Sequence, residues 1–239
     1  MLSKRAKSIS PVPSHLALIP DGNRRWSRGH SLSLYKGYAF GIKKFMDFGM
    51  WAKSFGVKTI TVWALSTENV KKRSRLELGV LYGLYIKSAK DPKILARLAK
   101  NHARVRIIGN LQMLPAKLKE ALRYMERATQ AYSDFTINIL VGYGGKEDIL
   151  YAFRNAQCRA EAAKGVDEEF LAKHIRTASI PDVDLIIRTS GEMRLSGFLP
   201  WQSNYSELYF AKKHWPEFEK HDLEMALRTF AQRERRFGR

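Results

Sequence analysis

Short apolar runs rich in β-branched residues recur along the chain and alternate with segments of helical period. Each run is long enough to form one buried strand. The runs occupy residues 15–19, 59–64, 105–108, 135–141, 183–187 and 207–210. Strands that alternate with helices predict a mostly parallel sheet with helices on both faces. The predicted fold class is therefore α/β, with a six-stranded central sheet flanked by helices.

The intervals between these runs carry the helices. A polar stretch at 28–35 predicts a loop, after which a helical period begins near Gly37 and ends at Gly56, a suitable left-handed C-cap. A long second helix should begin at Ser74 and break at Asp91-Pro92, because proline cannot continue a helix. Further helices are expected at 115–131, from 146 onward, at 167–175 and at 223–231.

Length and composition indicate one domain. The 239 residues show no compositional seam, so we expect a single domain at 14–239 after a short flexible tail at 1–13. The longest apolar runs are of strand length, which predicts no transmembrane helix, and the basic start of the chain lacks the apolar block of a signal peptide. The single cysteine, Cys158, excludes an internal disulfide and fits an inert thiol in the reducing cytoplasm.

The charge balance points to anionic partners. Lys and Arg number 42 against 23 Asp and Glu, which gives a formal net charge of +19. Such a surplus favours nucleic acid, an anionic membrane surface or phosphorylated substrates, although most of these charges are expected to be solvated. The basic residues are dispersed and form no nucleic-acid recognition module, so nucleic-acid binding is disfavoured. Peripheral contact with a membrane stays open.

Polar clusters follow three of the predicted strands at the point where each strand ends. Residues 21–26 follow the first strand, 66–69 the second and 188–196 the fifth. The carboxyl ends of parallel strands meet at one edge of a sheet, where ligands bind. We therefore expect one site that collects Asp21, Asn23, Arg25, Asn69, Arg188, Arg194 and Ser196.

These residue types favour a magnesium–diphosphate site. A lone aspartate suits Mg²⁺, which takes its other oxygens from substrate phosphates and water. Arginines fork onto phosphate oxygens, as Arg25, Arg188 and Arg194 could do. For each residue alone a structural role is the better interpretation: Asp21 in a turn, the arginines paired with Glu192 or solvated. Three clusters at one edge favour the site.

Other chemistries find little support. No His/Cys cluster has zinc spacing, and no histidine lies in a recognisable nucleophile–base arrangement. The glycine-rich turn at 142–145 could present backbone N–H groups to phosphate. It lacks both the P-loop ending and the dinucleotide glycine spacing, so its signal is weak.

Five blocks of the sequence resemble the signature blocks of cis-prenyltransferases, the undecaprenyl diphosphate synthase family. They lie in family order and read DGNRRW at 21–26, GYGGKEDI at 142–149, DLIIRTSGE at 184–192, ELYF at 207–210 and RERRFG at 233–238. The resemblance implies a homodimer, sometimes a heterodimer, with an apolar tunnel beneath a parallel sheet. It also implies condensation of an allylic diphosphate with isopentenyl diphosphate, using Mg²⁺. The helix from Ser74 would line the tunnel, with Gly79 and Gly83 leaving room for a chain.

The resemblance also implies roles for residues at the diphosphate end. Asp21 would hold Mg²⁺ against the allylic diphosphate, and Glu207 would assist the metal. The substrate-binding residues implied for the first loop and its neighbour are Gly22, Asn23, Arg24, Arg25, Trp26 and Tyr38. Those implied for the acceptor's diphosphate are Arg188, Arg194 and Ser196.

Two further groups are implied by position. Asn69, with Ser66 nearby, falls in the block linked to proton removal after carbon–carbon bond formation, and both are predicted to be catalytic. Arg236 and Gly238 match the C-terminal Arg-x-Gly, which in the family reaches the partner subunit's site.

The sequence departs from the family pattern at several positions. Leu34 replaces an arginine of the allylic-diphosphate site, Tyr38 and Met193 each replace a histidine, and Val70 replaces an aromatic residue. Gly37-Tyr38 and the bare Pro20-Asp21 entry look more like the branch that makes lavandulyl-type diphosphates by joining two allylic units head to middle. Unlike that branch, this chain keeps Glu68-Asn69.

These departures leave alternatives for the acceptor. It is isopentenyl diphosphate by the main resemblance, or a second allylic diphosphate or a hydroxyl by the departures. A non-catalytic, lipid-binding subunit of a heteromeric enzyme is a remoter alternative. Such subunits typically lack the first-loop aspartate and arginines, and this chain keeps Asp21, Asn23 and Arg25.

Overall fold

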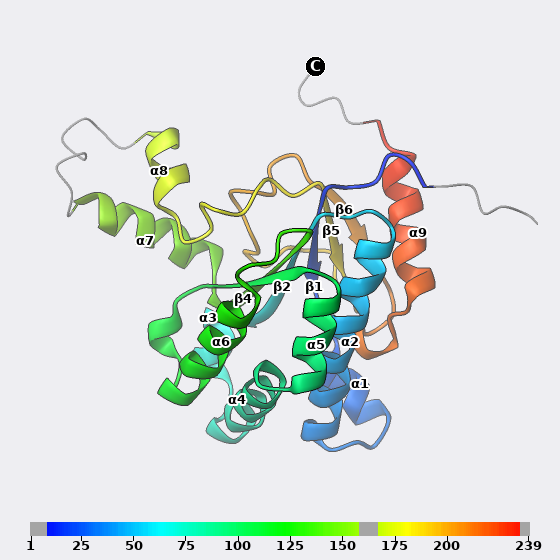
Figure 1. Ribbon diagram of the computed structural model, residues 1–239, viewed down its shortest axis with the longest axis vertical. Coiled ribbons are helices and arrows are strands. Elements are labelled where there is room, and N and C mark those ends of the chain that lie inside the picture. Colours follow the sequence, from blue (N-terminus) through cyan, green and yellow to red (C-terminus); the bar gives the residue numbers. More distant parts are fainter. Residues whose placement is uncertain (1–8, 158–166, 235–239) are drawn as a thin grey trace, which may run out of the picture.

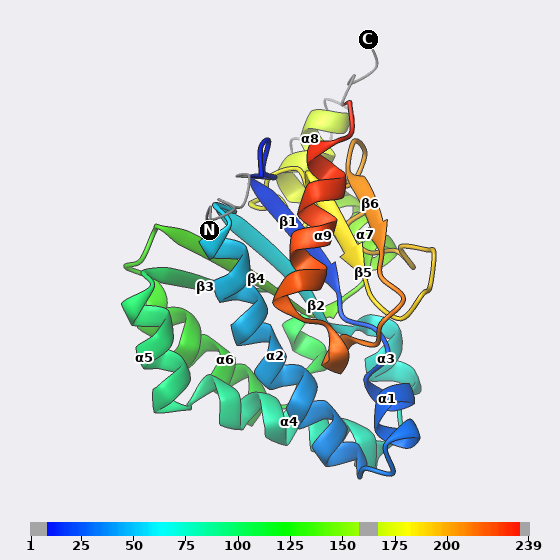
Figure 2. The same ribbon diagram turned by 90° about the vertical axis from the view of Figure 1, so that its right-hand side faces the viewer.

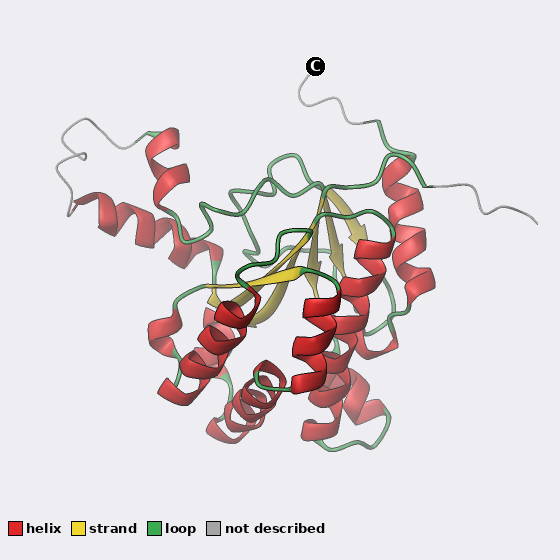
Figure 3. Cartoon of the chain, in the orientation of Figure 1, coloured by secondary structure: helices red, strands yellow, loops and turns green. Residues whose placement is uncertain are grey.

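A single parallel sheet of six strands forms the centre of the protein (Figures 1 and 3). The computed structural model describes residues 9–157 and 167–234. The strands are β1 (His15–Ile19), β2 (Thr59–Ser66), β3 (Ala103–Ile108), β4 (Phe135–Tyr143), β5 (Leu185–Arg188) and β6 (Glu207–Phe210). Their order is β3-β4-β2-β1-β5-β6, and every neighbouring pair is parallel. The predicted sheet is confirmed.

Helices connect the strands. They are α1 (Asn23–Gly29), α2 (Leu34–Ser54), α3 (Thr67–Lys72), α4 (Arg75–Ala89), α5 (Pro92–Lys100), α6 (Ala116–Thr129), α7 (Gly145–Gln157), α8 (Glu168–His174) and α9 (Lys220–Ala231), with 3₁₀ turns at Leu111–Met113 and Trp215–Glu217. The predicted break between α4 and α5 is present, because Asp91 caps α5 by accepting a hydrogen bond from the Lys93 N–H at 2.8 Å. Gly56 ends α2 with φ +97°, as its position predicts.

The core lies on both faces of the sheet. The larger cluster packs α2, α4, α5, α6 and α9 against one face, and Figure 2 shows α2 and α9 in front of the strands. The second cluster takes Ile180, Val183, Phe198 and Leu199 from irregular segments around β5. A strand buried on both sides needs apolar residues throughout, which is why β1 is entirely buried.

The segment after β1 agrees only in part with the expected loop at 28–35, because residues 30–33 alone lie outside helices. It forms helix α1 and then enters α2, for which Ser33 is the N-cap: its hydroxyl accepts a hydrogen bond from the Lys36 N–H at 3.3 Å. Helix α1 packs closely on α2 because Gly41 has no side chain. A Cβ atom there would lie 2.0 Å from the Asn23 Oδ1.

The start of the described chain also differs from the expected flexible tail at 1–13. Ile9 and Val12 pack against the larger core cluster, and Pro13 is buried. Residues 1–8 and Cys158 lie outside the described ranges. Within those ranges, no helix combines the length and apolar character that a bilayer span requires.

The strand order places a ligand site at one point of the sheet. The connection after β1 leads to β2 on one side, whereas β5 lies on the other side of β1. Such a reversal opens a crevice beyond the carboxyl ends of β1 and β5. Asp21 and Arg188 lie at the ends of β1 and β5 and therefore meet there.

Candidate active site

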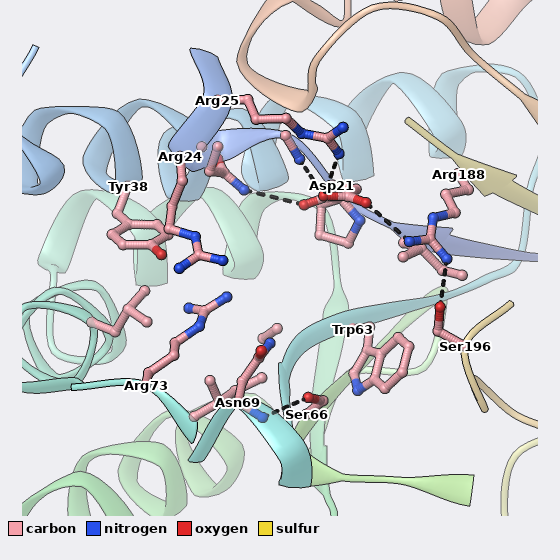
Figure 4. A pocket seen from close by; sticks show the side chains of 18 of the residues that line it. Asp21, Arg24, Arg25, Tyr38, Trp63, Ser66, Asn69, Arg73, Arg188 and Ser196 are labelled. Atoms are coloured by element: carbon pink, nitrogen blue, oxygen red, sulfur yellow. Dashed lines mark hydrogen bonds and ion pairs between the residues drawn. The ribbon is translucent and has the colours of Figure 1, made fainter. Parts of the chain in front are cut away.

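A cavity of about 730 Å³ opens at the carboxyl ends of β1, β2 and β5 (Figure 4). Its size is in the range of small-molecule binding sites. Eleven of the residues singled out from the sequence line it: Asp21, Gly22, Asn23, Arg24, Arg25, Tyr38, Ser66, Asn69, Arg188, Arg194 and Ser196. The polar clusters after the three strands thus converge, while the individual binding and catalytic roles stay predictions.

Asp21 is the anionic centre of the cavity. One carboxylate oxygen lies 3.0 Å from the Arg188 guanidinium, and the other lies 3.2 Å from Arg25 and accepts the Gly22 N–H at 2.6 Å. Partial burial opposes ionisation, but the hydrogen bond and charge of Arg188, with the charge of Arg25, hold the pKa of the Asp21 carboxyl below its usual value. Asp21 is therefore a carboxylate at neutral pH.

Arg188 is the buried cation of the site. Its side chain is only 6% exposed. Besides Asp21, its guanidinium donates to the Ser196 hydroxyl at 2.9 Å and to the Arg194 carbonyl oxygen. These bonds fix the loop after β5 to the loop after β1, so the predicted acceptor-diphosphate residues form one preorganised group.

Neighbouring residues fix the backbone of the first loop by close packing and hydrogen bonds. Gly22 adopts φ +100°, and a Cβ there would lie 2.6 Å from the His214 Nδ1 and 2.8 Å from the Ser190 Oγ. The Asp21 carbonyl oxygen accepts hydrogen bonds from the Thr189 hydroxyl at 2.7 Å and the Trp215 N–H at 2.9 Å. Only glycine suits position 22, and the loop geometry is set before any ligand binds.

Two arginines at the mouth of the cavity share one carboxylate. Glu192 accepts from Arg25 at 2.7 Å and pairs with Arg194 at 2.6 Å. Arg194 therefore forms the ion pair with Glu192 that a structural role would require. Both guanidinium groups remain about half exposed, with 47% and 60% of the side chain accessible, so both can turn towards a ligand.

A second cationic wall lies across the cavity and includes residues that the sequence analysis missed. Glu77 accepts from the Tyr38 hydroxyl at 2.6 Å and lies 3.2 Å from Arg73 and 3.5 Å from Arg24. Figure 4 shows Arg24 and Arg73 pointing towards each other in the open part of the cavity. Burial, together with the neighbouring Glu77, raises the pKa of the Tyr38 phenol, so Tyr38 stays neutral and donates.

This wall bears on the replacement at Leu34. Leu34 packs against the core and does not line the cavity. Arg24 and Arg73 line the cavity and place two positive charges there. Leu34 lies outside the cavity and carries no charge. The basic run at 71–73 is visible in the sequence, but only the fold selects Arg73 from it, because Lys71 and Lys72 do not line the cavity.

The polar stretch after β2 forms helix α3. Ser66 is the N-cap of α3, and its hydroxyl oxygen accepts the Asn69 N–H at 3.0 Å. Ser66 therefore has a structural role in addition to its place in the cavity. The hydrogen bond fixes Asn69 on the first turn of α3, with its amide facing the cavity (Figure 4).

Some predicted site residues lie elsewhere. The Trp26 ring contacts His30 at 4.6 Å with the rings tilted by 35°, and it meets Phe40 edge to face at 5.3 Å. The helical turn of α1 directs Trp26 away from the cavity that Arg25 lines. Its role is to seat α1 on α2. Arg236 and Gly238 lie outside the described residues.

Glu207 is also far from Asp21 within this chain. It pairs in register with Leu185 at the amino end of β5, whereas the site lies beyond Arg188 at the carboxyl end. Its carboxylate binds Arg233 instead. In the described ranges no three His, Cys, Asp or Glu side chains cluster as a metal site. Asp21 lies between Arg25 and Arg188, so a metal held there would take its other oxygens from substrate and water.

The glycine-rich turn after β4 is a packing element. The Gly145 N–H donates to the Gly197 carbonyl oxygen at 2.9 Å, and a Cβ at Gly145 would lie 2.3 Å from Pro200. The turn thus supports the loop after β5 and does not line the cavity. The phosphate role considered for it is not realised.

An apolar hollow of about 90 Å³ continues from the cavity beneath the sheet's helical face. Phe45, Ala64 and Tyr85 line both spaces. The Tyr85 hydroxyl donates to the Ala64 carbonyl oxygen at 2.7 Å, at the neck between them. Helix α4 lines this route as predicted, but Gly79 and Gly83 are exposed and face open space, so they make no room for a chain.

Comparisons with known proteins agree with this geometry. A family model described as putative undecaprenyl diphosphate synthase matches residues 19–238. An isoprenyl transferase of Thermus thermophilus is 44% identical over 96% of this chain and 90% of that protein. A tritrans,polycis-undecaprenyl-diphosphate synthase of Methanopyrus kandleri, named as geranylgeranyl-diphosphate specific, is 42% identical over 95% of this chain and 85% of that protein.

Two crystal structures share the fold. Lavandulyl diphosphate synthase from Lavandula x intermedia, in complex with dimethylallyl diphosphate, superposes with a TM-score of 0.89 at 32% identity, covering 95% of this chain and 99% of that one. A probable undecaprenyl diphosphate synthase from Campylobacter jejuni gives a TM-score of 0.78 at 28% identity, with the same coverage.

Proposed function

This chain belongs to the undecaprenyl diphosphate synthase family of prenyl transferases, and we propose that it extends an allylic prenyl diphosphate with isopentenyl diphosphate in cis, using Mg²⁺. The observation that carries the proposal is the convergence of Asp21, Arg25 and Arg188 at the mouth of a cavity that continues into an apolar hollow. A charged head and a hydrocarbon tail are the two parts of such a substrate.

The cationic residues divide into two groups that suit two diphosphates. Arg188, Arg194 and Ser196 gather at the end of β5 and would bind the diphosphate of the acceptor. Arg24, Arg25 and Arg73 line the same cavity and would bind the allylic diphosphate. Two substrates held with their reacting carbons together need no further binding step before bond formation.

Asp21 fits the requirement for a magnesium ligand. It is an ionised carboxylate, 29% exposed, and it opens into the cavity with arginines on both sides. When bound, Mg²⁺ would neutralise diphosphate charge and so assist departure of the leaving group. Arg25 would contribute positive charge to the same leaving group, and Arg188 to the diphosphate of the acceptor, because each need only exchange the Asp21 carboxylate for phosphate oxygens.

Ser66 and Asn69 stand where the new bond would form, between the two groups of arginines. The Ser66 oxygen already accepts the Asn69 N–H, which leaves the hydroxyl proton of Ser66 to donate to a ligand oxygen. We propose that this pair orients the acceptor while a proton leaves it, as the resemblance implies. The neutral Tyr38 would donate to the substrate or hold Glu77 between the two arginines.

A second candidate function is head-to-middle coupling of two allylic diphosphates. It is supported by the structural similarity to lavandulyl diphosphate synthase and by Gly37-Tyr38 and the Pro20-Asp21 entry. The retained Glu68-Asn69 and the curated relatives favour chain elongation. A non-catalytic lipid-binding role is disfavoured because Asp21, Arg25 and Arg188 are all in place.

One experiment separates these functions. Pure protein is incubated with Mg²⁺ and each of dimethylallyl, geranyl, farnesyl and geranylgeranyl diphosphate, with and without isopentenyl diphosphate, and the products are identified by mass spectrometry. Elongation predicts longer products only when isopentenyl diphosphate is present. A product of two joined allylic units that forms without it would establish the head-to-middle reaction instead. The absence of product from every pairing would refute the enzyme proposal.

We also propose a homodimer in which Arg236 and Gly238 reach the partner's cavity. Support comes from the position of the end of α9, at the edge of the sheet opposite the site, where Arg233 binds Glu207 (Figure 2). Mixing an Asp21→Asn subunit with an Arg236→Ala subunit should restore turnover. In the mixed dimer, the site that keeps Asp21 receives an unmodified Arg236 from the other subunit. If the mixture stays as inactive as its parents, the shared site is wrong.

A further inference from the structure

An open groove lies on the surface between α2 and the corner of α4 and α5. It encloses about 340 Å³. Its floor is apolar and includes Ile42, Met46 and Ile94, whereas its rim carries Lys43, Lys87, Lys93 and Arg97. An apolar floor inside a basic rim is an uncommon surface for a protein that only needs to be solvated.

The groove continues the route that begins at the diphosphates. Met46, Ser88 and Ile94 line both the groove and the 90 Å³ apolar hollow, and Ile42 lines the groove, the hollow and the main cavity. The three spaces are therefore neighbours that share lining residues.

The hollow is too small to store a long hydrocarbon. Its volume of about 90 Å³ is well below the roughly 300 Å³ at which pockets for small molecules begin. A chain that grows from the cavity must therefore pass through the hollow and continue. The groove is the continuation that the lining residues provide.

The charged residues at the rim of the groove favour an anionic partner. Lys43, Lys87 and Lys93 are exposed and form no ion pair among the described residues, whereas Arg97 pairs with Asp47 at 2.8 Å. The Asp91 carboxylate, the other acid of the rim, accepts the Lys93 and Ile94 N–H groups. Three lysines thus remain to meet an anionic surface.

We propose that this groove is a second, lateral opening of the hydrocarbon channel and that it docks on an anionic bilayer. The inference rests on the proposed function. The hydrocarbon leaves over the apolar floor into the lipid, while Lys43, Lys87 and Lys93 lie on the lipid phosphates. Tyr35, 48% exposed at the end of the groove, is placed for the interfacial zone that aromatic side chains favour.

The docking is tested without turnover. The full chain is sedimented with vesicles of phosphatidylcholine, with or without phosphatidylglycerol. Changing Lys43, Lys87 and Lys93 together to Glu should weaken binding to the anionic vesicles by at least about tenfold. A matched variant changes Lys58, Lys146 and Lys212 to Glu; these exposed lysines line none of the three spaces, and this variant should bind within about twofold of the unmodified chain.

Several outcomes would overturn the docking surface. Equal losses in the two triple variants would mean that net charge alone drives binding. If the chain shows no preference for vesicles with phosphatidylglycerol, an anionic bilayer is not the partner of the groove. If the groove variant keeps vesicle binding but loses retention of duplex DNA, the rim binds nucleic acid instead.

The lateral opening is tested by plugging it. Ser88→Trp places a large side chain where the hollow meets the groove, and the product distribution should shift to shorter chains. Gly83→Trp adds the same group on the same helix into open space and should leave the distribution unchanged. Ser88→Leu is the milder plug if the tryptophan variant does not fold.

Unchanged product lengths in a folded Ser88 variant would refute the lateral opening. The two levels of inference fail separately. A chain that makes no product but binds anionic vesicles through the groove would contradict the proposed function alone. A chain that elongates without vesicle binding would contradict the docking alone.

Discussion

The carboxylate of Asp21 lies 3.0 Å from the guanidinium of Arg188, and this ion pair joins the ends of β1 and β5. The two residues are 167 positions apart in the chain. Their meeting brings the first polar cluster to the fifth strand, so that one anion and several cations share a cavity. The pair also holds Arg188 in a buried position until a diphosphate can replace the carboxylate.

Removing the charge of Asp21 should stop turnover. In Asp21→Asn the shape is kept, but the magnesium ligand and the partner of Arg188 are both weakened, so kcat/KM should fall by at least about 100-fold. Steady-state kinetics over a range of Mg²⁺ measures this. Asp47→Asn is the matched control, because Asp47 is similarly exposed and pairs with Arg97 outside the main cavity. Activity of Asp21→Asn near that of the control would place the metal elsewhere.

The Asp21–Arg188 pair should also make stability depend on pH at the acid end. The folded pKa of Asp21 lies below its usual 3.8, so the pair stabilises fully above that pH and loses its contribution as the pH falls through the folded pKa. The difference in unfolding free energy between the unmodified chain and Asp21→Asn, measured by urea denaturation from neutral to acid pH, should shrink below about pH 4. A difference that stays constant to the lowest pH would contradict the pairing.

Much of this architecture is readable in the sequence because burial and turn chemistry are local. The strands lie where β-branched runs occur, and Asp91-Pro92 and Gly56 end helices as their chemistry dictates. The convergence of Asp21 and Arg188 also follows, because parallel strands share one edge. The family resemblance then supplied roles that no local pattern contains.

What the sequence could not provide depends on packing between distant segments. The polar composition of α1 hides a helix that exists because Gly37 and Gly41 let it lie against α2. Trp26 belongs to the motif but turns away from the cavity once α1 is helical. Glu77 joins Tyr38 to two arginines only after α2 and α4 are packed together.

Substitution of Arg73 tests the second cationic wall. Arg73→Ala removes a charge that faces the allylic side of the cavity, so the KM for the allylic diphosphate should rise about tenfold while the KM for isopentenyl diphosphate changes little. Lys72→Ala removes the neighbouring charge, which does not line the cavity, and should leave both constants unchanged. Equal effects from the two substitutions would indicate a general loss of positive field rather than a contact.

Gly41→Ala tests the close packing of α1 on α2. The new Cβ would lie 2.0 Å from the Asn23 Oδ1, so the amide and the start of α1 must shift, and both turnover and the melting temperature should fall. Gly83→Ala is the control on a helix surface with open space, and it should raise stability by about 0.5–1 kcal/mol. Thermal unfolding by circular dichroism compares the two. A Gly41→Ala protein as stable and active as the unmodified chain would show that α1 tolerates displacement.

The neck between the cavity and the apolar hollow gives the last prediction. Ala64 lies where the pairing of β2 with β4 shifts register, and the Tyr85 hydroxyl donates to its carbonyl oxygen at 2.7 Å. Burial raises the pKa of Tyr85 to about 12, so the phenol remains a donor over the working pH range. In Tyr85→Phe the buried carbonyl loses its partner, which should cost about 1–3 kcal/mol of unfolding free energy. The same change should widen the neck and raise the share of longer products.

Tyr82→Phe is the control, because Tyr82 is a partly exposed tyrosine one helical turn away that does not line the route. Neither the unfolding free energy nor the share of longer products should change in it. If Tyr85→Phe behaves like Tyr82→Phe in both measurements, the hydrogen bond to Ala64 does not hold the neck.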